Sequence, residues 1–284
     1  MSKILALIDG SIYSQSVCDH AAWAARGTNA SVEVLHVLGR RDVSSVPANL
    51  SGNLDMDTRD ALLAELASLD EQKAKLAQKR GRAILDDARA RLRDAGVTEV
   101  STKFRNGDLA DTVLEFEADA DLVVIGKRGE AADFATLHLG SNLERVVRAS
   151  RKPVLVASRA FQPIARMLIA FDGGASAMKA VDQIALSPVF AGLECRLLTV
   201  GEDTPAARKR LDDAVAVLAG AGFSVQADIV PGQPETVIAA TVETDGFDLL
   251  VMGAYGHSRI RSLIIGSTTT EMIRSCKIPI MLFR

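Results

Sequence analysis

An internal repeat constrains the fold of this 284-residue chain more than any other feature of its sequence. Residues 121–126 read DLVVIG and residues 248–253 read DLLVMG. The segments that follow also match, with LGSNLERVVRASRKPVLV at 139–156 and IGSTTTEMIRSCKIPIML at 265–282. The repeat predicts two domains of one fold, residues 1–158 and 164–284, in line with about 150 residues per domain.

Each half alternates short apolar runs with segments of helical spacing. The expected strands cover residues 3–8, 32–38, 100–105, 121–125 and 153–157 in the first half, and 166–171, 194–200, 225–230, 248–252 and 279–283 in the second. Strands that alternate with helices predict an α/β fold, in which a doubly wound parallel sheet carries helices on both faces.

The halves differ most in one inserted segment, at about residues 39–80. Residues 39–58 are rich in turn formers and predict a loop. Residues 59–95 predict one long helix or two, because Leu62, Leu66, Leu69 and Leu76 keep an approximately helical spacing. We expect this helix to pack on its own sheet, and a partner-binding surface is the alternative.

Composition excludes several classes of protein. The formal net charge is −3, so the chain as a whole is a poor electrostatic match for nucleic acid. No apolar run approaches 18 residues and the N-terminus has no secretory pattern, so we expect neither a membrane span nor export. Three cysteines that lie far apart, Cys18, Cys195 and Cys276, form no CxxC pair and fit core positions in a reducing cytoplasm.

The residues from Gly253 to Thr270, which read GAYGHSRIRSLIIGSTTT, have the layout of a phosphate site. They follow an expected strand and lead into an expected helix, and a helix N-terminus offers unpaired N–H donors and a partial positive charge. In a doubly wound sheet, Asp172 would face this loop across the crevice at the carboxyl ends of the strands. Arg259 and Arg261 either add positive charge there or are solvated loop residues.

At these residues the chain resembles a tandem universal stress protein. The nucleotide-binding members of that family carry G-x2-G-x9-G-[ST], which Gly253, Gly256, Gly266 and Ser267 match in full. The resemblance implies two five-stranded parallel sheets of order 3-2-1-4-5, and ATP or a related adenine nucleotide with Mg²⁺ on its phosphates. It also implies roles for individual residues: Asp172 near adenine, Val200 near ribose, and Gly253, Gly256, Gly266, Ser267, Thr268 and Thr269 near the phosphates. The chain has Tyr255 where the family often has histidine.

The first half departs from this pattern. Ten residues, not nine, separate Gly129 from Gly140. The corresponding residues form a weaker candidate site: Asp9, Val37, Gly126, Gly129, Gly140 and Ser141. Lys127 and Arg128 keep a phosphate role open there. The alternative for both hydroxyl clusters is structural, because Ser141-x-x-Glu144 and Thr268-x-x-Glu271 also fit capping boxes.

These features favour a cytoplasmic stress-response protein that binds and senses a nucleotide. There is no GxxxxGK[ST], no GxGxxG after the first strand and no identifiable nucleophile–base pair, so we expect at most slow ATP hydrolysis. The alternatives are a nucleotide-free scaffold that acts through residues 39–95, and a slow ATPase. By resemblance, Val154–Ala157 and Ile280–Phe283 should pair within the chain, and two chains should form a homodimer. Beyond the nucleotide and a possible regulatory protein, we expect no nucleic-acid or membrane partner.

Overall fold

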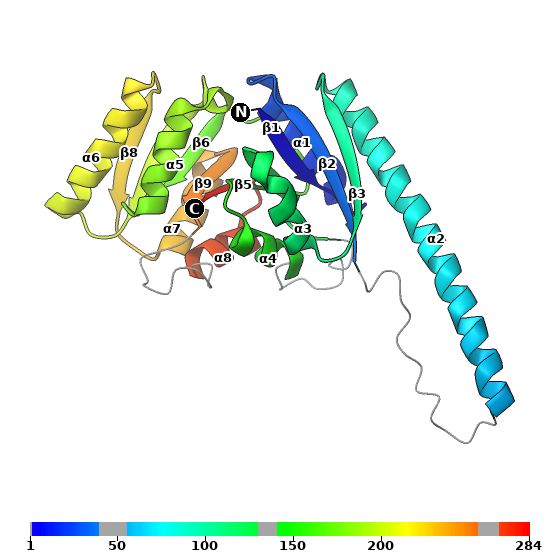
Figure 1. Ribbon diagram of the computed structural model, residues 1–284. Coiled ribbons are helices and arrows are strands. Elements are labelled where there is room, and N and C mark those ends of the chain that lie inside the picture. The colour runs from blue at the N-terminus through cyan, green and yellow to red at the C-terminus, as the bar shows by residue number, and fades with distance from the viewer. Residues whose placement is uncertain (1, 40–55, 130–140, 255–266) are drawn as a thin grey trace.

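The ten strands among the described residues form one continuous sheet (Figure 1). The computed structural model describes residues 2–39, 56–129, 141–254 and 267–284. The first half contains β1 (Lys3–Leu7), α1 (Tyr13–Arg26), β2 (Ser31–Leu38), α2 (Met56–Asp94), β3 (Val100–Asn106), α3 (Leu109–Phe116), the short η2 (Glu117–Asp119), β4 (Leu122–Gly126), α4 (Ser141–Ala149) and β5 (Val154–Ala157). The second half contains β6 (Arg166–Ala170), α5 (Ala175–Leu186), the short η4 (Pro188–Phe190), β7 (Glu194–Val200), α6 (Pro205–Gly220), β8 (Val225–Val230), α7 (Pro234–Asp245), β9 (Leu249–Gly253), α8 (Ser267–Ser275) and β10 (Ile280–Phe283).

The strand order is β3-β2-β1-β4-β5-β10-β9-β6-β7-β8. Within each half this is the predicted order 3-2-1-4-5, with parallel pairing throughout. The halves join where β10 pairs antiparallel with β5, with Met281 opposite Leu155. The predicted pairing of these two strands within one chain is therefore confirmed.

Two apolar cores lie on the two faces of the sheet. Side chains of α1, α2, α5 and α6 contribute to one core, including Ala21, Leu85, Val181 and Leu211. Side chains of α3, α4, α7 and α8 contribute to the other, including Val146, Ile238 and Met272. Strand side chains alternate between the two faces, so the strands are apolar on both sides, as buried parallel strands require.

Helix α2 is one continuous helix of 39 residues, whereas its counterpart α6 has 16. Only its C-terminal part packs on the sheet, through Leu85, Ala88 and Leu92. Among residues 60–94, whose burial is described, the first buried position is Gly81, where an added Cβ would lie 2.2 Å from the ring of Phe104. Glycine therefore allows the helix to approach β3 closely, and the residues before it project beyond the edge of the sheet (Figure 1).

Contacts between side chains and backbone also connect the halves. Lys127 Nζ donates a hydrogen bond to the carbonyl oxygen of Cys276 at 2.5 Å, just after α8. The Arg284 guanidinium donates to the carbonyl oxygens of Arg148 and Ser150, at the end of α4. Positive groups stabilise helix C-termini, so a cation from each half supports the end of a helix in the other.

Candidate functional site

The predicted site residues of the second half gather at one edge of the sheet. Strands β6 and β9 are parallel neighbours, with Ala170 opposite Met252. Asp172 follows the end of β6 and Gly253 is the last residue of β9, so the two lie at adjacent strand ends, as the crevice requires. Val200 ends β7, on the other side of β6.

The start of α8 is fastened to the same edge. The Thr269 hydroxyl donates a hydrogen bond to the Gly253 carbonyl at 3.2 Å, and Thr269 is buried. This bond places the first turn of α8 beside the end of β9. An α-helix leaves the N–H groups of its first turn without partners inside the helix, so Ser267, Thr268 and Thr269 present backbone donors at this edge.

Asp172 lies in a tight turn and its side chain is exposed. Its Oδ1 accepts a hydrogen bond from the Gly174 N–H at 2.8 Å. Gly173 has φ of +71°, a conformation that glycine adopts without steric cost. The turn fixes the direction of the carboxylate at the start of α5.

The first half repeats this turn. Asp9 Oδ1 accepts from the Ser11 N–H at 3.0 Å, and Gly10 has φ of +82°. A Cβ added at Gly129 would lie 2.8 Å from Asp9 Oδ2. The aspartate turn and the glycine loop after β4 therefore meet, as the topology predicts.

The residues that flank the two sites differ. A Cβ added at Gly126 would lie 2.7 Å from Cβ and 3.4 Å from Cγ of Tyr13, a buried side chain. At the equivalent Gly253 the neighbour is the smaller Ser176, with Cβ at 3.1 Å. Tyr13 and Ser176 each lie four residues after the site aspartate, so aligning the halves by eye could have found this difference.

A second difference lies on the following helix. A Cβ added at Gly173 would lie 2.5 Å from Nε and 2.9 Å from Cδ of Arg210, on α6. At Gly10 the corresponding contact is 2.5 Å to Cδ1 of Ile84, on α2. The side chain nearest the turn is therefore a guanidinium in the second site and an aliphatic group in the first, where the Arg80 guanidinium lies farther off, with Nη2 3.8 Å from the added Cβ. Sequence reasoning missed Arg210, because no motif connects a helix arginine to a strand end far from it in sequence.

Lys127 is directed toward the other half of the molecule. Its ammonium is bound to the Cys276 carbonyl, and burial lowers its pKa. Because the ammonium donates to the Cys276 carbonyl, Lys127 is directed at the join between the halves, and its phosphate role in the first half stays a prediction.

Several predicted residues lie outside the described part of the chain. They are Gly140, Tyr255, Gly256, Arg259, Arg261 and Gly266. The loops of the two halves differ in length by one residue, and the effect of this difference on ligand binding stays a prediction. Ser141 begins α4, but its side chain also lies outside the described part of the structure.

The helix starts bear on the capping alternative. Helix α8 begins at Ser267 and α4 at Ser141. Thr268 is thus the second helical residue and Ser141 the first, whereas a capping box needs its hydroxyl at the N-cap. Glu144 pairs with Arg148, and Glu271 Oε2 accepts from Arg274 at 2.6 Å, so both glutamates engage arginines within their own helices.

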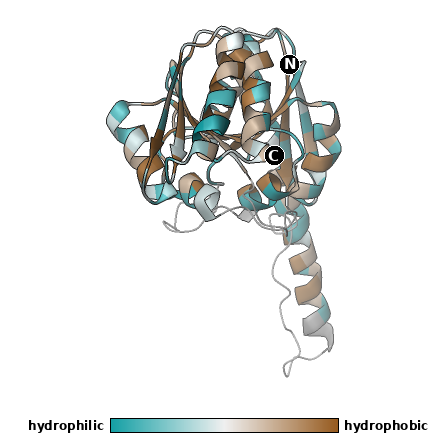
Figure 2. Cartoon of the chain, turned by 90° about the vertical axis from the view of Figure 1, so that its left-hand side faces the viewer, coloured by the Kyte–Doolittle hydropathy of each residue, from teal (hydrophilic) through white to brown (hydrophobic). Residues whose placement is uncertain are grey.

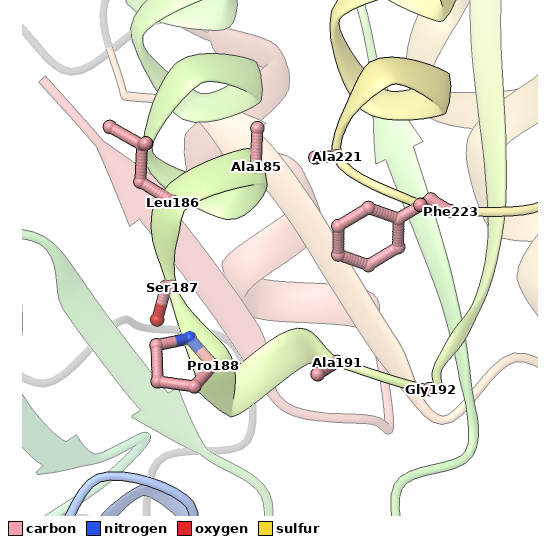
Figure 3. Close-up of a pocket in the computed structure, with 9 residues that line it drawn as sticks. Ala185, Leu186, Ser187, Pro188, Ala191, Gly192, Ala221 and Phe223 are labelled. Carbon is pink, nitrogen blue, oxygen red and sulfur yellow. The ribbon is translucent and has the colours of Figure 1, made fainter.

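A pocket of about 320 Å³ lies elsewhere, near the C-terminal ends of α5 and α6 (Figure 3). Leu186, Pro188 and Phe223 line it with small residues such as Ala191 and Gly192. Because Asp172 precedes the N-terminus of α5, this pocket is at the opposite end of that helix from the candidate site. Its lining contains no charged side chain, and it does not resemble a phosphate site.

Other chemistries find little support in the described residues. Within the described ranges, no group of three or more His, Cys, Asp or Glu side chains could hold a metal ion. No helix among the described residues is both long and apolar enough to cross a membrane. Burial raises the pKa of Cys18 and Cys195 to about 12, so these thiols are poor nucleophiles near neutral pH.

Comparisons with known proteins agree with these features. The profile of the universal stress protein family matches residues 1–158 and 198–284. A universal stress protein of Synechocystis, Slr1230, is 39% identical over 287 residues, which cover 100% of both chains. The YxiE universal stress protein of Bacillus subtilis is 30% identical over 157 residues, 55% of this chain and 97% of its own. A crystal structure of a universal stress protein from Archaeoglobus fulgidus superimposes with a TM-score of 0.72 at 19% identity, over 99% of this chain and 95% of that one. The chain therefore belongs to the universal stress protein family, as a tandem of two copies of its fold.

Proposed function

We propose that this protein binds ATP or a related adenine nucleotide, chiefly in its second half, and acts as a cytoplasmic sensor or regulator in a stress response. The two halves act as domains, residues 1–158 and 164–284, and the first carries the insertion at about residues 39–80. The first domain has a weaker site or none.

One arrangement supports the proposal above all others. The turn at Asp172, the end of β9 at Gly253 and the first turn of α8 converge at one edge of the sheet. A carboxylate in that position accepts hydrogen bonds from an exocyclic amine or a hydroxyl, and helix N–H donors favour phosphate. The arrangement therefore has a hydrogen-bond acceptor at one end and donors at the other, which complements the amine and the phosphates of an adenine nucleotide.

Family resemblance and this geometry suggest a role for each residue. Asp172 accepts from adenine and Val200 contacts ribose. The backbone from Gly253, Gly256 and Gly266 to Ser267, Thr268 and Thr269 surrounds the phosphates. Mg²⁺ then binds mainly through phosphate oxygens and water.

The proposed activity is binding, with at most slow hydrolysis. The described part of the site brings no nucleophile and base together at Asp172 or Gly253. Incubation with labelled ATP tests this point. ADP release at the rate of an Asp172→Ala variant rules out a dedicated ATPase, whereas release that depends on Asp172 would favour the slow ATPase.

Isothermal titration with ATP tests the proposal itself. We expect saturable heat from the wild-type chain, heat much reduced in Asp172→Ala, and heat unchanged in the matched first-half variant Asp9→Ala. Both substitutions remove a turn carboxylate, so they control for each other. An absence of heat from the wild type, or equal heat from all three proteins, would favour the nucleotide-free scaffold.

A further inference from the structure

The projecting part of α2, residues 60–79, is the largest feature of the molecule that the nucleotide site leaves unexplained. Every side chain in this segment is exposed or half-buried. We propose that it is a self-association surface, which pairs antiparallel with the same segment of a second copy of this chain.

A leucine stripe runs along the segment. It consists of Leu62, Leu66, Leu69 and Leu76, with Leu63 beside it. Leu69 is 45% and Leu76 68% exposed, and brown bands mark this part of the helix in Figure 2. Steps of four, three and seven residues are those of a coiled-coil seam. Apolar side chains at such spacing are costly to leave in water.

The stripe does not continue the face that packs on the sheet. At about 100° per residue, its direction lies roughly a quarter turn from that of Gly81, Leu85 and Ala88. The helix therefore cannot cover the stripe by lying flat on its own β3. Any side chains that cover the stripe must therefore come from a segment or molecule other than the sheet on which α2 packs.

Charge along the segment identifies the partner. Residues 60–71 contain four acidic and no basic side chains, whereas residues 72–82 contain five basic and no acidic ones. Two copies in parallel would place like charges side by side, which is unfavourable. Two copies in antiparallel orientation place each acidic part beside a basic part, in the self-complementary way that a two-fold axis requires.

One overlap satisfies both the leucines and the charges. If the two-fold axis of the antiparallel pair passes near residue 71 of each helix, Leu66 packs on Leu76 of the second copy. Glu65 then lies beside Lys79 of that copy, and Asp70 beside Lys73. Lys73 occupies a seam position, where a polar residue specifies register.

Sedimentation or light scattering measures this association directly. We expect a dimer of the wild-type chain at micromolar concentration. Leu69→Asp with Leu76→Asp should weaken it about tenfold or more, because two buried leucines become charged. The control, Ala64→Asp with Gln78→Asp, adds the same charge on the opposite face of the helix and should leave the dimer intact.

A charge exchange tests orientation without relying on a loss of association. Glu65→Lys with Asp70→Lys makes both members of each proposed ion pair basic in one variant, and Lys73→Glu with Lys79→Glu makes both members acidic in another. We expect each alone to be monomeric and their mixture to form a heterodimer. Two monomers that stay apart when mixed would contradict antiparallel pairing.

Cross-linking tests the register. On oxidation, the cysteine of Gln72→Cys should form a disulfide with the same position of the second chain. The cysteine of Gln78→Cys, on the outer face of the helix, should not. The native thiols are buried and do not compete. A monomeric wild type, or a dimer that survives the leucine substitutions, would overturn the proposal; the first result would favour residues 40–55 of the same chain as the cover.

Discussion

The carboxyl ends of β1 and β4 in the first half correspond to those of β6 and β9 in the second, and the two sites share their scaffold but not their surroundings. Both have the Asp-Gly turn, with a backbone N–H bonded to the aspartate. In the first, Tyr13 crowds Gly126 and Ile84 covers Gly10. In the second, the smaller Ser176 lies beside Gly253, and Arg210 lies over Gly173.

The difference suggests how one copy of a duplicated domain can lose ligand affinity while it keeps its fold. The aspartate turn also supports the start of α1 or α5, so the fold retains it in both halves. The side chain beside the glycine and the one nearest the turn differ between the halves, and both lie at the edge of the sheet where we propose that the ligand binds. Because these flanking residues differ, we expect the halves to differ in affinity and not in fold.

The largest effect should come from bulk at the end of β9. In Gly253→Val the new Cβ lies 3.1 Å from the Ser176 Cβ, and its methyl groups obstruct the backbone that faces the phosphates. We expect ATP affinity to fall about a hundredfold or more, near 3 kcal/mol. Titration calorimetry measures this loss.

Gly220→Val is the matched control for that substitution. It adds the same side chain at the end of α6, where nothing lies within 4 Å of the new Cβ. Its affinity should equal that of the wild type. Wild-type affinity in Gly253→Val would show that the end of β9 is not part of the site.

A smaller loss should follow removal of the turn carboxylate. Asp172→Ala deletes one acceptor for the base, and a charge-assisted hydrogen bond contributes about 1.5–3 kcal/mol. We therefore expect affinity to fall roughly 10- to 100-fold. Asp9→Ala should bind as the wild type does; if both variants weaken binding equally, the asymmetry between the halves is wrong.

Substitution of Arg210 on α6 tests the second difference between the two sites. Arg210→Ile gives the second half the side chain that lies nearest the turn in the first, and we expect the Kd for ATP to rise about threefold to tenfold. The loss should shrink as salt is raised, because an exposed arginine acts through screened charge. An unchanged Kd at low salt would limit Arg210 to a packing role.

The smallest effect concerns the join between the halves. Lys127→Met removes the hydrogen bond to Cys276, and we expect a loss of about 1–2 kcal/mol in stability against urea with no change in ATP affinity. Burial lowers the pKa of Lys127 in the fold, so the folded state binds fewer protons at this group than the unfolded state. Stability of the wild type relative to Lys127→Met should therefore rise with pH, from the lowered pKa up to the ordinary lysine value. A change in ATP affinity would contradict the assignment of Lys127 to the join.

The sequence predicted most of the fold, because apolar periodicity and the repeat report backbone structure directly. The strand order and the pairing of β5 with β10 both came from resemblance, and the structure confirms both. The sequence could not decide whether this segment forms one helix or two, because both give the same apolar spacing. It also did not fix the start of α2, because loop and helix signals overlap near residue 58.

The candidate site was less accessible to sequence reasoning. Asp172 and Gly253 follow strand ends, and topology alone brings them together. Arg210 and Tyr13 depend on how helices settle on the sheet, which no local pattern encodes. The contact of Lys127 with Cys276 was missed for the same reason, because the two residues lie 149 positions apart in the sequence.

Native mass spectrometry of the chain with ATP tests the central claim most directly, because it counts bound nucleotides. We predict one nucleotide per chain in the wild type and in Asp9→Ala, and none in Gly253→Val under the same conditions. Two equivalent nucleotides per chain, or one that persists in Gly253→Val, would contradict the assignment of binding to the second half.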